Sequence, residues 1–192
     1  EMPVYVQQHS PSNPDPAAVE KAADLISSSR FPMLYLGWGA VDAFDDSVIL
    51  AEMLAAPVAT SLQGKSAFPN SHPLFTSAGL GKGAKPSGQW ALKNHDLLLT
   101  VGARFGEVAT ASYALDPPKN LVHVDINPAV FNKNFPAVQT LTCDGKAFIK
   151  ALHTELLKRG YSSRNRLTEV TGEIRKRNDG YFEEWVHKAR TD

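Results

Sequence analysis

The chain has 192 residues, 43% of them hydrophobic and 21% charged, which is typical of a globular domain with one sizeable core. Its 20 Lys and Arg residues balance 20 Asp and Glu residues, which argues against a dedicated nucleic-acid or membrane-surface binder. The single cysteine, Cys143, excludes an internal disulfide and a multi-cysteine metal cluster, and we expect a cytoplasmic protein.

The first predicted helix covers residues 17–28. Asp15 stands directly before Pro16, the usual order of an N-cap acid and a proline in the first helical turn. The apolar positions of this segment recur at helical spacing and predict one buried face: Val19, Ala22, Ala23 and Ile26.

Short apolar runs bounded by turn residues follow the first helix. They predict strands over residues 33–36, 58–61, 97–101, 121–126 and 138–142. Little polar alternation occurs in 97–101 and 121–126, which is typical of strands covered on both faces. Helices are predicted between the strands, over residues 43–55, about 87–93 and 146–158. This alternation indicates a doubly wound α/β domain with a parallel sheet.

Charged residues become frequent after Lys158. Residues 164–190 predict one or two exposed helices that pack along one thin stripe. The apolar positions expected in that stripe are Ile174, Phe182, Trp185 and Val186. We therefore divide the chain into a domain over residues 1–160 and a helical extension or linker over residues 161–192. The chain begins at Glu1 without a signal-peptide pattern, and we expect it to belong to a longer polypeptide.

Ligands of open parallel sheets bind beyond the carboxyl ends of the strands, so the residues there are the candidate site. Gly37 and Gly39 follow the first strand and would let the backbone approach a phosphate, although a tight strand-to-helix turn explains them equally well. Lys65 follows the second strand and is either a phosphate ligand or a solvated surface lysine. The glycine-rich segment 79–83 is either a lid or a plain connection.

Two charged residues follow the third and fourth predicted strands. Arg104 would engage a phosphate or carboxylate through its planar guanidinium, or would form a structural ion pair. Asp125 would accept hydrogen bonds from ribose hydroxyls, or would cap a helix beginning near Pro128. Asp144 occupies the same position after the fifth strand, and there helix capping is the better interpretation.

The remaining residues form no catalytic pattern. The six histidines are scattered without metal-ligand spacing, and His123, inside a predicted buried strand, is interpreted as a core residue with its hydrogen bonds satisfied. Cys143 has no clear partner, and Ser61 and Ser66 lie in no nucleophile elbow. The chain is therefore predicted to bind and not to react.

The strand-end segments resemble the central domain of thiamine-diphosphate-dependent enzymes of the acetolactate synthase, decarboxylase and carboligase group. The similarity covers residues 1–160, and the matching segments include 32–40, 57–65, 68–74, 96–105, 123–128 and 132–134. It implies a Rossmann-like parallel sheet of about six strands with helices on both faces, followed by the C-terminal helical extension.

The resemblance also implies what surrounds this domain. In the family it lies between a pyrimidine-binding and a pyrophosphate-binding domain, which together hold thiamine diphosphate and Mg²⁺. These two domains are the expected partners, and the parent is expected to be a homo-oligomeric transferase or lyase acting on 2-oxo acids. No catalytic or metal residue is assigned to this chain, which is expected to be inactive by itself. The short run Cys143-Asp144-Gly145 lacks the leading glycine of the family's Mg²⁺ motif.

Some members of the family bind FAD or an ADP moiety in the central domain. Carried over by position, the implied contacts here are Gly37, Gly39, Ser61, Leu62, Gly102, Arg104, Asp125 and Ile126. The sequence departs from the FAD-binding pattern at three positions, where Trp38 replaces a glycine and Gly106 and Asn127 replace acids. Two alternatives to a nucleotide-binding domain of a larger enzyme stay open: a self-contained nucleotide-binding or electron-transfer module, and a structural spacer with an empty site.

Overall fold

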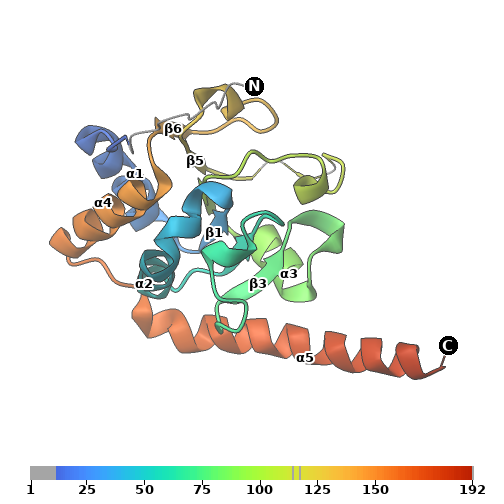
Figure 1. The fold of residues 1–192 in the computed structure, drawn as a ribbon. Coiled ribbons are helices and arrows are strands. Elements are labelled where there is room, and N and C mark those ends of the chain that lie inside the picture. The colour runs from blue at the N-terminus through green and yellow to red at the C-terminus, as the bar shows by residue number, and fades with distance from the viewer. Residues whose placement is uncertain (1–11, 114, 117, 192) are drawn as a thin grey trace, which may run out of the picture.

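The computed structural model describes residues 12–113, 115–116 and 118–191 (Figure 1). Six strands form one parallel sheet in the order β3-β2-β1-β4-β5-β6. The strands are β1 (Pro32–Leu36), β2 (Val58–Thr60), β3 (Phe75–Ala78), β4 (Leu97–Val101), β5 (Leu121–Asp125) and β6 (Gln139–Thr142). The helices are α1 (Pro16–Ser28), α2 (Phe44–Leu54), α3 (Pro86–Asn94), α4 (Gly145–Lys158) and α5 (Leu167–Thr191). The predicted α/β class with a Rossmann-like parallel sheet is confirmed.

Helices cover both faces of the sheet, which explains why every residue of β1, β4 and β5 is buried. Leu34 and Leu99 pair in register on the face that packs against α1, α2 and α4. Met33 and Leu98 pair on the opposite face, in a second cluster that includes Ala91 of α3. Figure 1 shows α1, α2 and α4 together on one side of the sheet and α3 on the other. Two-sided burial is what the small amount of polar alternation in these segments predicts.

The starts of α1 and α4 are fixed by acidic N-caps. The Asp15 carboxylate accepts a hydrogen bond from the Ala17 N–H at 3.2 Å, with Pro16 at the first helical position. Asp144 accepts from the Ala147 N–H at 2.8 Å. Each cap satisfies a backbone donor that has no partner inside its helix, so both capping predictions are confirmed.

Strand β3 is the element that the residue pattern misses. Its sequence Phe-Thr-Ser-Ala carries two polar residues, and none of the five predicted strands includes it. Both are buried with their hydroxyls satisfied, because Thr76 donates to the Val58 carbonyl and Ser77 donates to the Gly79 carbonyl, each at 2.9 Å. Strand β3 is the sixth strand that the family resemblance implies.

Helix α5 runs along the body of the domain and packs mainly against α3 (Figure 1). Val170 and Ile174 are buried in the core, so the expected thin apolar stripe is present around Ile174. The Arg177 guanidinium lies 4.4 Å from the ring centre of Trp90 on α3, a cation–π contact that adds to the docking. The side chains of Phe182, Trp185 and Val186 lie outside the described part. Among the described helices, none has the length and apolar content needed to cross a membrane.

Candidate functional site

The eight predicted contact residues lie at one edge of the sheet. Strands β2, β1, β4 and β5 are neighbours and parallel, so their carboxyl ends meet at the same edge. The chain leaves β1 toward β2 and later returns to β4 on the other side of β1, which makes this edge a topological switch point. The residues brought there are Gly37, Gly39, Ser61, Leu62, Gly102, Arg104, Asp125 and Ile126.

The glycines at this edge touch one another through their backbones. A Cβ added to Gly37 would lie 2.0 Å from the carbonyl oxygen of Gly102, and one added to Gly102 would lie 2.4 Å from the Cα of Gly39. A Cβ on Gly64 would lie 2.5 Å from the carbonyl carbon of Gly37, and one on Gly145 would lie 2.3 Å from the carbonyl oxygen of Gly39. Four chain segments therefore meet at a spacing that leaves no room for a side chain, whatever binds there: those that hold Gly37 and Gly39, Gly64, Gly102 and Gly145.

The amide groups of the same glycines are already used inside the protein. Gly37 N–H donates to the Val101 carbonyl at 2.9 Å, and Gly102 N–H donates to the Val124 carbonyl at 2.8 Å. Gly39 N–H donates to the Gly102 carbonyl at 3.2 Å. These bonds extend the sheet past the strand ends. The tight-turn interpretation of Gly37 and Gly39 thus has direct structural support, and their amides are not free donors for a phosphate.

The polar side chains of the site also make local bonds. Ser61 Oγ accepts from the Gly64 N–H at 3.0 Å. Asp125, only 8% exposed, accepts from the Asn127 N–H at 2.9 Å. Asn127 in turn caps the short 3₁₀ helix η5 (Pro128–Val130) by accepting from the Ala129 N–H at 3.0 Å. The suggestion that Asp125 caps this helix is wrong, because Asn127 occupies the cap position.

Arg104 is an exposed cation at this edge. No ion pair or hydrogen bond among the described residues involves its guanidinium, so the alternative of a structural ion pair receives no support. Its neighbours in the chain, Ala103 and Phe105, are buried at 4% and 3% exposure.

His123 is buried on β5, and its Nε2–H donates to the Ala103 carbonyl at 2.8 Å. The prediction that His123 is a core residue with a hydrogen-bond partner is confirmed.

Large apolar side chains also lie exposed at this edge, and one of them was not predicted as a contact. Trp38 begins the 3₁₀ helix η1 (Trp38–Ala43) and is 69% exposed, while Leu62 and Ile126 are 42% and 43% exposed. Ile126 follows the end of β5 directly, and Trp38 and Leu62 each stand two positions after the end of β1 and β2. The signal in the sequence was the placement of Trp38 between two glycines, where no neighbouring side chain can cover an indole.

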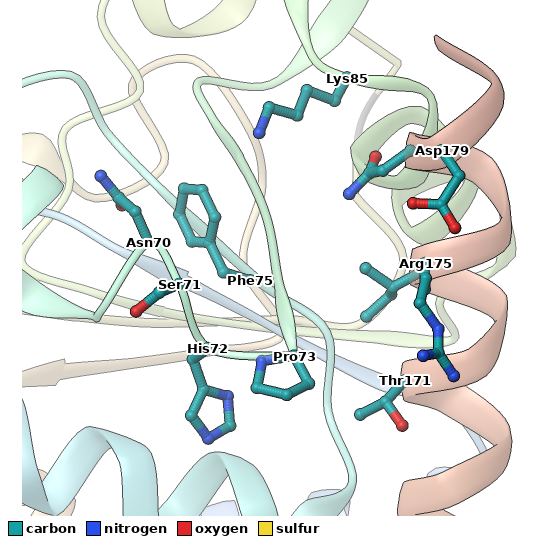
Figure 2. A pocket seen from close by; sticks show the side chains of 11 residues that line it. Asn70, Ser71, His72, Pro73, Phe75, Lys85, Thr171, Arg175 and Asp179 are labelled. Carbon is teal, nitrogen blue, oxygen red and sulfur yellow. The ribbon is translucent and has the colours of Figure 1, made fainter. Parts of the chain in front are cut away.

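A separate groove lies between α5 and the segment that precedes β3 (Figure 2). It encloses about 450 Å³, and Figure 2 shows Arg175 and Asp179 on α5 facing the segment with Asn70 and Phe75, with Lys85 nearby. None of the eight predicted contact residues lines it. Its walls carry cations and a carboxylate together, so they do not select a ligand of one charge. Lys65 is exposed and does not line this groove either.

The part of the chain that the structure describes contains no cluster of metal-binding side chains. No set of three His, Cys, Asp or Glu side chains is placed to hold a metal ion there. Cys143 is buried, and burial together with the neighbouring Asp144 raises the pKa of its thiol to about 11. A thiol with that pKa is protonated near neutral pH and is a poor nucleophile. The carboxylate of Asp144 is occupied as the cap of α4.

Comparisons with known proteins agree with this geometry. The sequence profile described as "Thiamine pyrophosphate enzyme, central domain" matches residues 19–152. The chain is 36% identical over 162 residues to a sulfoacetaldehyde acetyltransferase of Rhodobacter capsulatus, a match that covers 81% of this chain and 27% of that protein. It is 32% identical over 145 residues to a probable acetolactate synthase large subunit of Methanocaldococcus jannaschii, covering 74% of this chain and 24% of that protein.

A solved structure of an enzyme is also similar to this chain. Benzoylformate decarboxylase from Polynucleobacter necessarius matches with a TM-score of 0.63 and 25% identity, over 87% of this chain and 31% of that chain. The chain spans about a quarter of the length of the curated relatives it matches. Because the profile covers more than half of the sequence, the chain belongs to the family of central domains of thiamine pyrophosphate enzymes.

Proposed function

We propose that this chain is the non-catalytic central domain of an enzyme that uses thiamine diphosphate and Mg²⁺ to form or break a carbon–carbon bond of a 2-oxo acid. The observation that carries this proposal is the match of residues 19–152 to the profile of the central domain of thiamine pyrophosphate enzymes. The residues of this chain do not fit a thiamine diphosphate–Mg²⁺ site, and we place that site between a pyrimidine-binding and a pyrophosphate-binding domain of the parent.

The names of the relatives support this class of reaction. They include an acetolactate synthase, an acetyltransferase and, among solved structures, a decarboxylase of benzoylformate, which is a 2-oxo acid. In such a parent the central domain would keep the two flanking domains in register and contribute contacts between subunits. The parent would then be a homo-oligomeric transferase or lyase of the cytoplasm.

The test uses the full-length protein that contains this chain. Purified protein is incubated with thiamine diphosphate, Mg²⁺ and pyruvate or benzoylformate, and both carbon dioxide release and condensed products are measured. Turnover that depends on both cofactors is expected. The isolated chain, measured in parallel, should give none. Absence of turnover with every 2-oxo acid, in protein shown to bind thiamine diphosphate, would contradict the assignment of substrate class.

We further propose that the carboxyl edge of the sheet binds an adenine nucleotide, either FAD or ADP. The observation that favours this function is the exposed guanidinium of Arg104, without an acidic partner among the described residues, at the edge where Trp38, Leu62 and Ile126 are exposed. A cation beside apolar side chains suits a phosphate joined to an aromatic base. Asp125 would accept from a ribose hydroxyl through the oxygen that does not bind Asn127.

The pyrophosphate part of such a ligand fits the glycines less well. Gly37, Gly39 and Gly102 direct their N–H groups to backbone carbonyls, so we assign them the task of shaping the edge. Ser61 and Leu62 would line the side of the site formed by β2. Phosphate recognition then falls to Arg104, and the affinity should depend strongly on salt.

The nucleotide site is tested by absorbance and titration. Full-length protein that carries FAD is yellow, and full-length protein that takes ADP should bind it with a Kd in the micromolar range or below, roughly −8 kcal/mol. Arg104→Gln should weaken binding, whereas Arg175→Gln on α5 is a matched control that removes an exposed cation elsewhere. Equal affinity of both variants and the unaltered protein would refute the assignment. Strong binding by the isolated chain would favour the self-contained module, and no binding to the full-length protein would favour the structural spacer.

A further inference from the structure

The loop from Gly102 to Phe105 holds Arg104 between two buried residues and in an unusual backbone conformation. Gly102 has φ +65° and Phe105 has φ +51°, so left-handed residues bracket Ala103 and Arg104. Glycine adopts this region freely, but a phenylalanine does so only when its surroundings hold it there. The contacts of Phe105 and Ala103 therefore decide where the guanidinium is presented.

Phe105 is fixed by aromatic packing on one face of the sheet. Its ring stacks on Tyr35 of β1 at a centroid distance of 5.5 Å, and it meets the edges of His123 at 5.3 Å and Phe135 at 5.2 Å. Its carbonyl accepts from Asn134 Nδ2 at 2.8 Å. These contacts fix the carboxyl-terminal side of the loop.

His123 fixes the amino-terminal side of the loop, at Ala103. The strand register pairs Thr100 of β4 with His123 of β5, which places the imidazole on the same face as the loop. Its Nε2–H donates to the Ala103 carbonyl at 2.8 Å, and its ring also packs against Phe131 at a centroid distance of 5.1 Å. His123 is the residue that contacts both flanking residues of Arg104: Ala103 through a hydrogen bond and Phe105 through its ring.

We infer that His123 is a positioning residue, which holds the Gly102–Phe105 loop so that Arg104 faces the phosphate of a bound adenine nucleotide. The inference rests on the nucleotide site proposed above. Burial lowers the pKa of His123, and the hydrogen bond to the Ala103 carbonyl and the neighbouring Asp125 only partly oppose that change. The imidazole is then neutral near pH 7 and its proton lies on Nε2, where the Ala103 carbonyl accepts it. The phosphate would be neutralised by Arg104 and not by the histidine.

Two substitutions separate this role from simple packing. In His123→Gln the amide Nε2 lies the same number of bonds from Cα as the imidazole Nε2, so it can still donate to the Ala103 carbonyl. In His123→Phe the aromatic ring stays in contact with Phe105 and Phe131, but the donor is lost. A role in packing alone predicts that His123→Phe is the milder change, and a role in positioning predicts the opposite order.

The experiment measures ADP affinity by calorimetry and amide hydrogen exchange of the 102–105 loop in the full-length protein. We expect His123→Phe to weaken ADP binding by about tenfold, the loss of one well-placed hydrogen bond, and His123→Gln to stay within about threefold. Amide exchange at Arg104 and Phe105 should be faster in His123→Phe than in the unaltered protein, and in His123→Gln it should have the rate of the unaltered protein. Thermal melting of each variant reports whether packing has changed.

The outcomes distinguish this inference from the nucleotide proposal. Unchanged ADP affinity and unchanged loop exchange in His123→Phe would overturn the positioning role, as would a larger loss in His123→Gln than in His123→Phe. If the unaltered protein carries no FAD and binds no ADP, the nucleotide proposal fails and with it the link to a phosphate. In that case loop exchange still decides whether His123 holds Arg104 in place: acceleration in the phenylalanine variant alone supports it, and no difference overturns it.

Discussion

Replacing Gly37 by alanine should destabilise the domain more than replacing any glycine that faces open space. The added Cβ would lie 2.0 Å from the Gly102 carbonyl oxygen, 2.5 Å from its carbon and 2.7 Å from the Ala103 Cα. All three are backbone atoms, so no side-chain rotation can relieve the overlap. The two loops must separate by roughly 1.4 Å before the Cβ and the oxygen reach ordinary contact.

The magnitude follows from what that separation disturbs. Forcing a methyl group into a packed interior costs about 1 to 3 kcal/mol. The same movement strains the hydrogen bonds from Gly37 N–H to Val101 and from Gly39 N–H to Gly102, each worth about 1 kcal/mol. The expected loss is therefore about 3 to 5 kcal/mol, a large part of the 5 to 15 kcal/mol that usually stabilises a domain.

Urea unfolding followed by circular dichroism measures this loss, and Gly106→Ala is the matched control. Gly106 lies at the same edge, and an added Cβ there meets nothing within 4 Å, so its effect should stay within about 0.5 kcal/mol. Gly39→Ala, with a closest distance of 2.8 Å, should fall between them and remains measurable if Gly37→Ala does not fold. A Gly37→Ala variant as stable as Gly106→Ala would refute the backbone-contact argument.

Three other measurements test separate parts of the structure. Gly172→Ala in α5 adds a Cβ that meets nothing within 4 Å, so it should raise the free energy of unfolding by up to about 1 kcal/mol; a lower denaturant midpoint would contradict this. Because burial raises the pKa of the Cys143 thiol to about 11, dithionitrobenzoate at pH 8 should label unfolded but not native protein, and rapid native labelling would be inconsistent with that burial. Burial lowers the pKa of His95 below its ordinary value of 6.5, so the unfolded chain binds the proton more readily. The free energy of unfolding should therefore fall as the pH drops below about 6.5, with His95 contributing at most about 1.4 kcal/mol per pH unit and His123 adding a drop of the same sign. His95→Gln should reduce this slope between pH 6.5 and 5, and an equally steep slope would count against the assignment to His95.

The sequence predicts the fold well where burial is two-sided. Leu97–Val101 shows little polar alternation, with Thr100 as its one polar residue, and β4 has those bounds in the structure. The pattern fails at β3, because Thr76 and Ser77 look like loop residues until the carbonyls that accept their hydroxyls are known. The Val58 carbonyl belongs to the neighbouring strand β2, so local sequence around β3 cannot show that the Thr76 hydroxyl is satisfied.

The sequence predicts where the candidate site lies better than it predicts which groups its residues contact. Parallel strands bring Gly37, Gly102 and Arg104 to one edge, and their position after apolar runs is enough to foresee that. The partners of the glycine N–H groups depend on the spacing of β1 and β4, which no local pattern encodes. The hydrogen bond from His123 to the Ala103 carbonyl likewise depends on the strand register that brings His123 beside the loop that carries Arg104.

The close approach of Gly37, Gly39, Gly64, Gly102 and Gly145 divides the carboxyl edge into fixed and changeable positions. A side chain at any of these five points pushes against the main chain of a different loop, so a substitution there disturbs several loops at once. The positions between them, such as Trp38 and Leu62, point outward and can be exchanged without moving the loops. Substitutions meant to change which ligand this edge binds should therefore begin with the outward-facing residues and leave the five glycines unchanged.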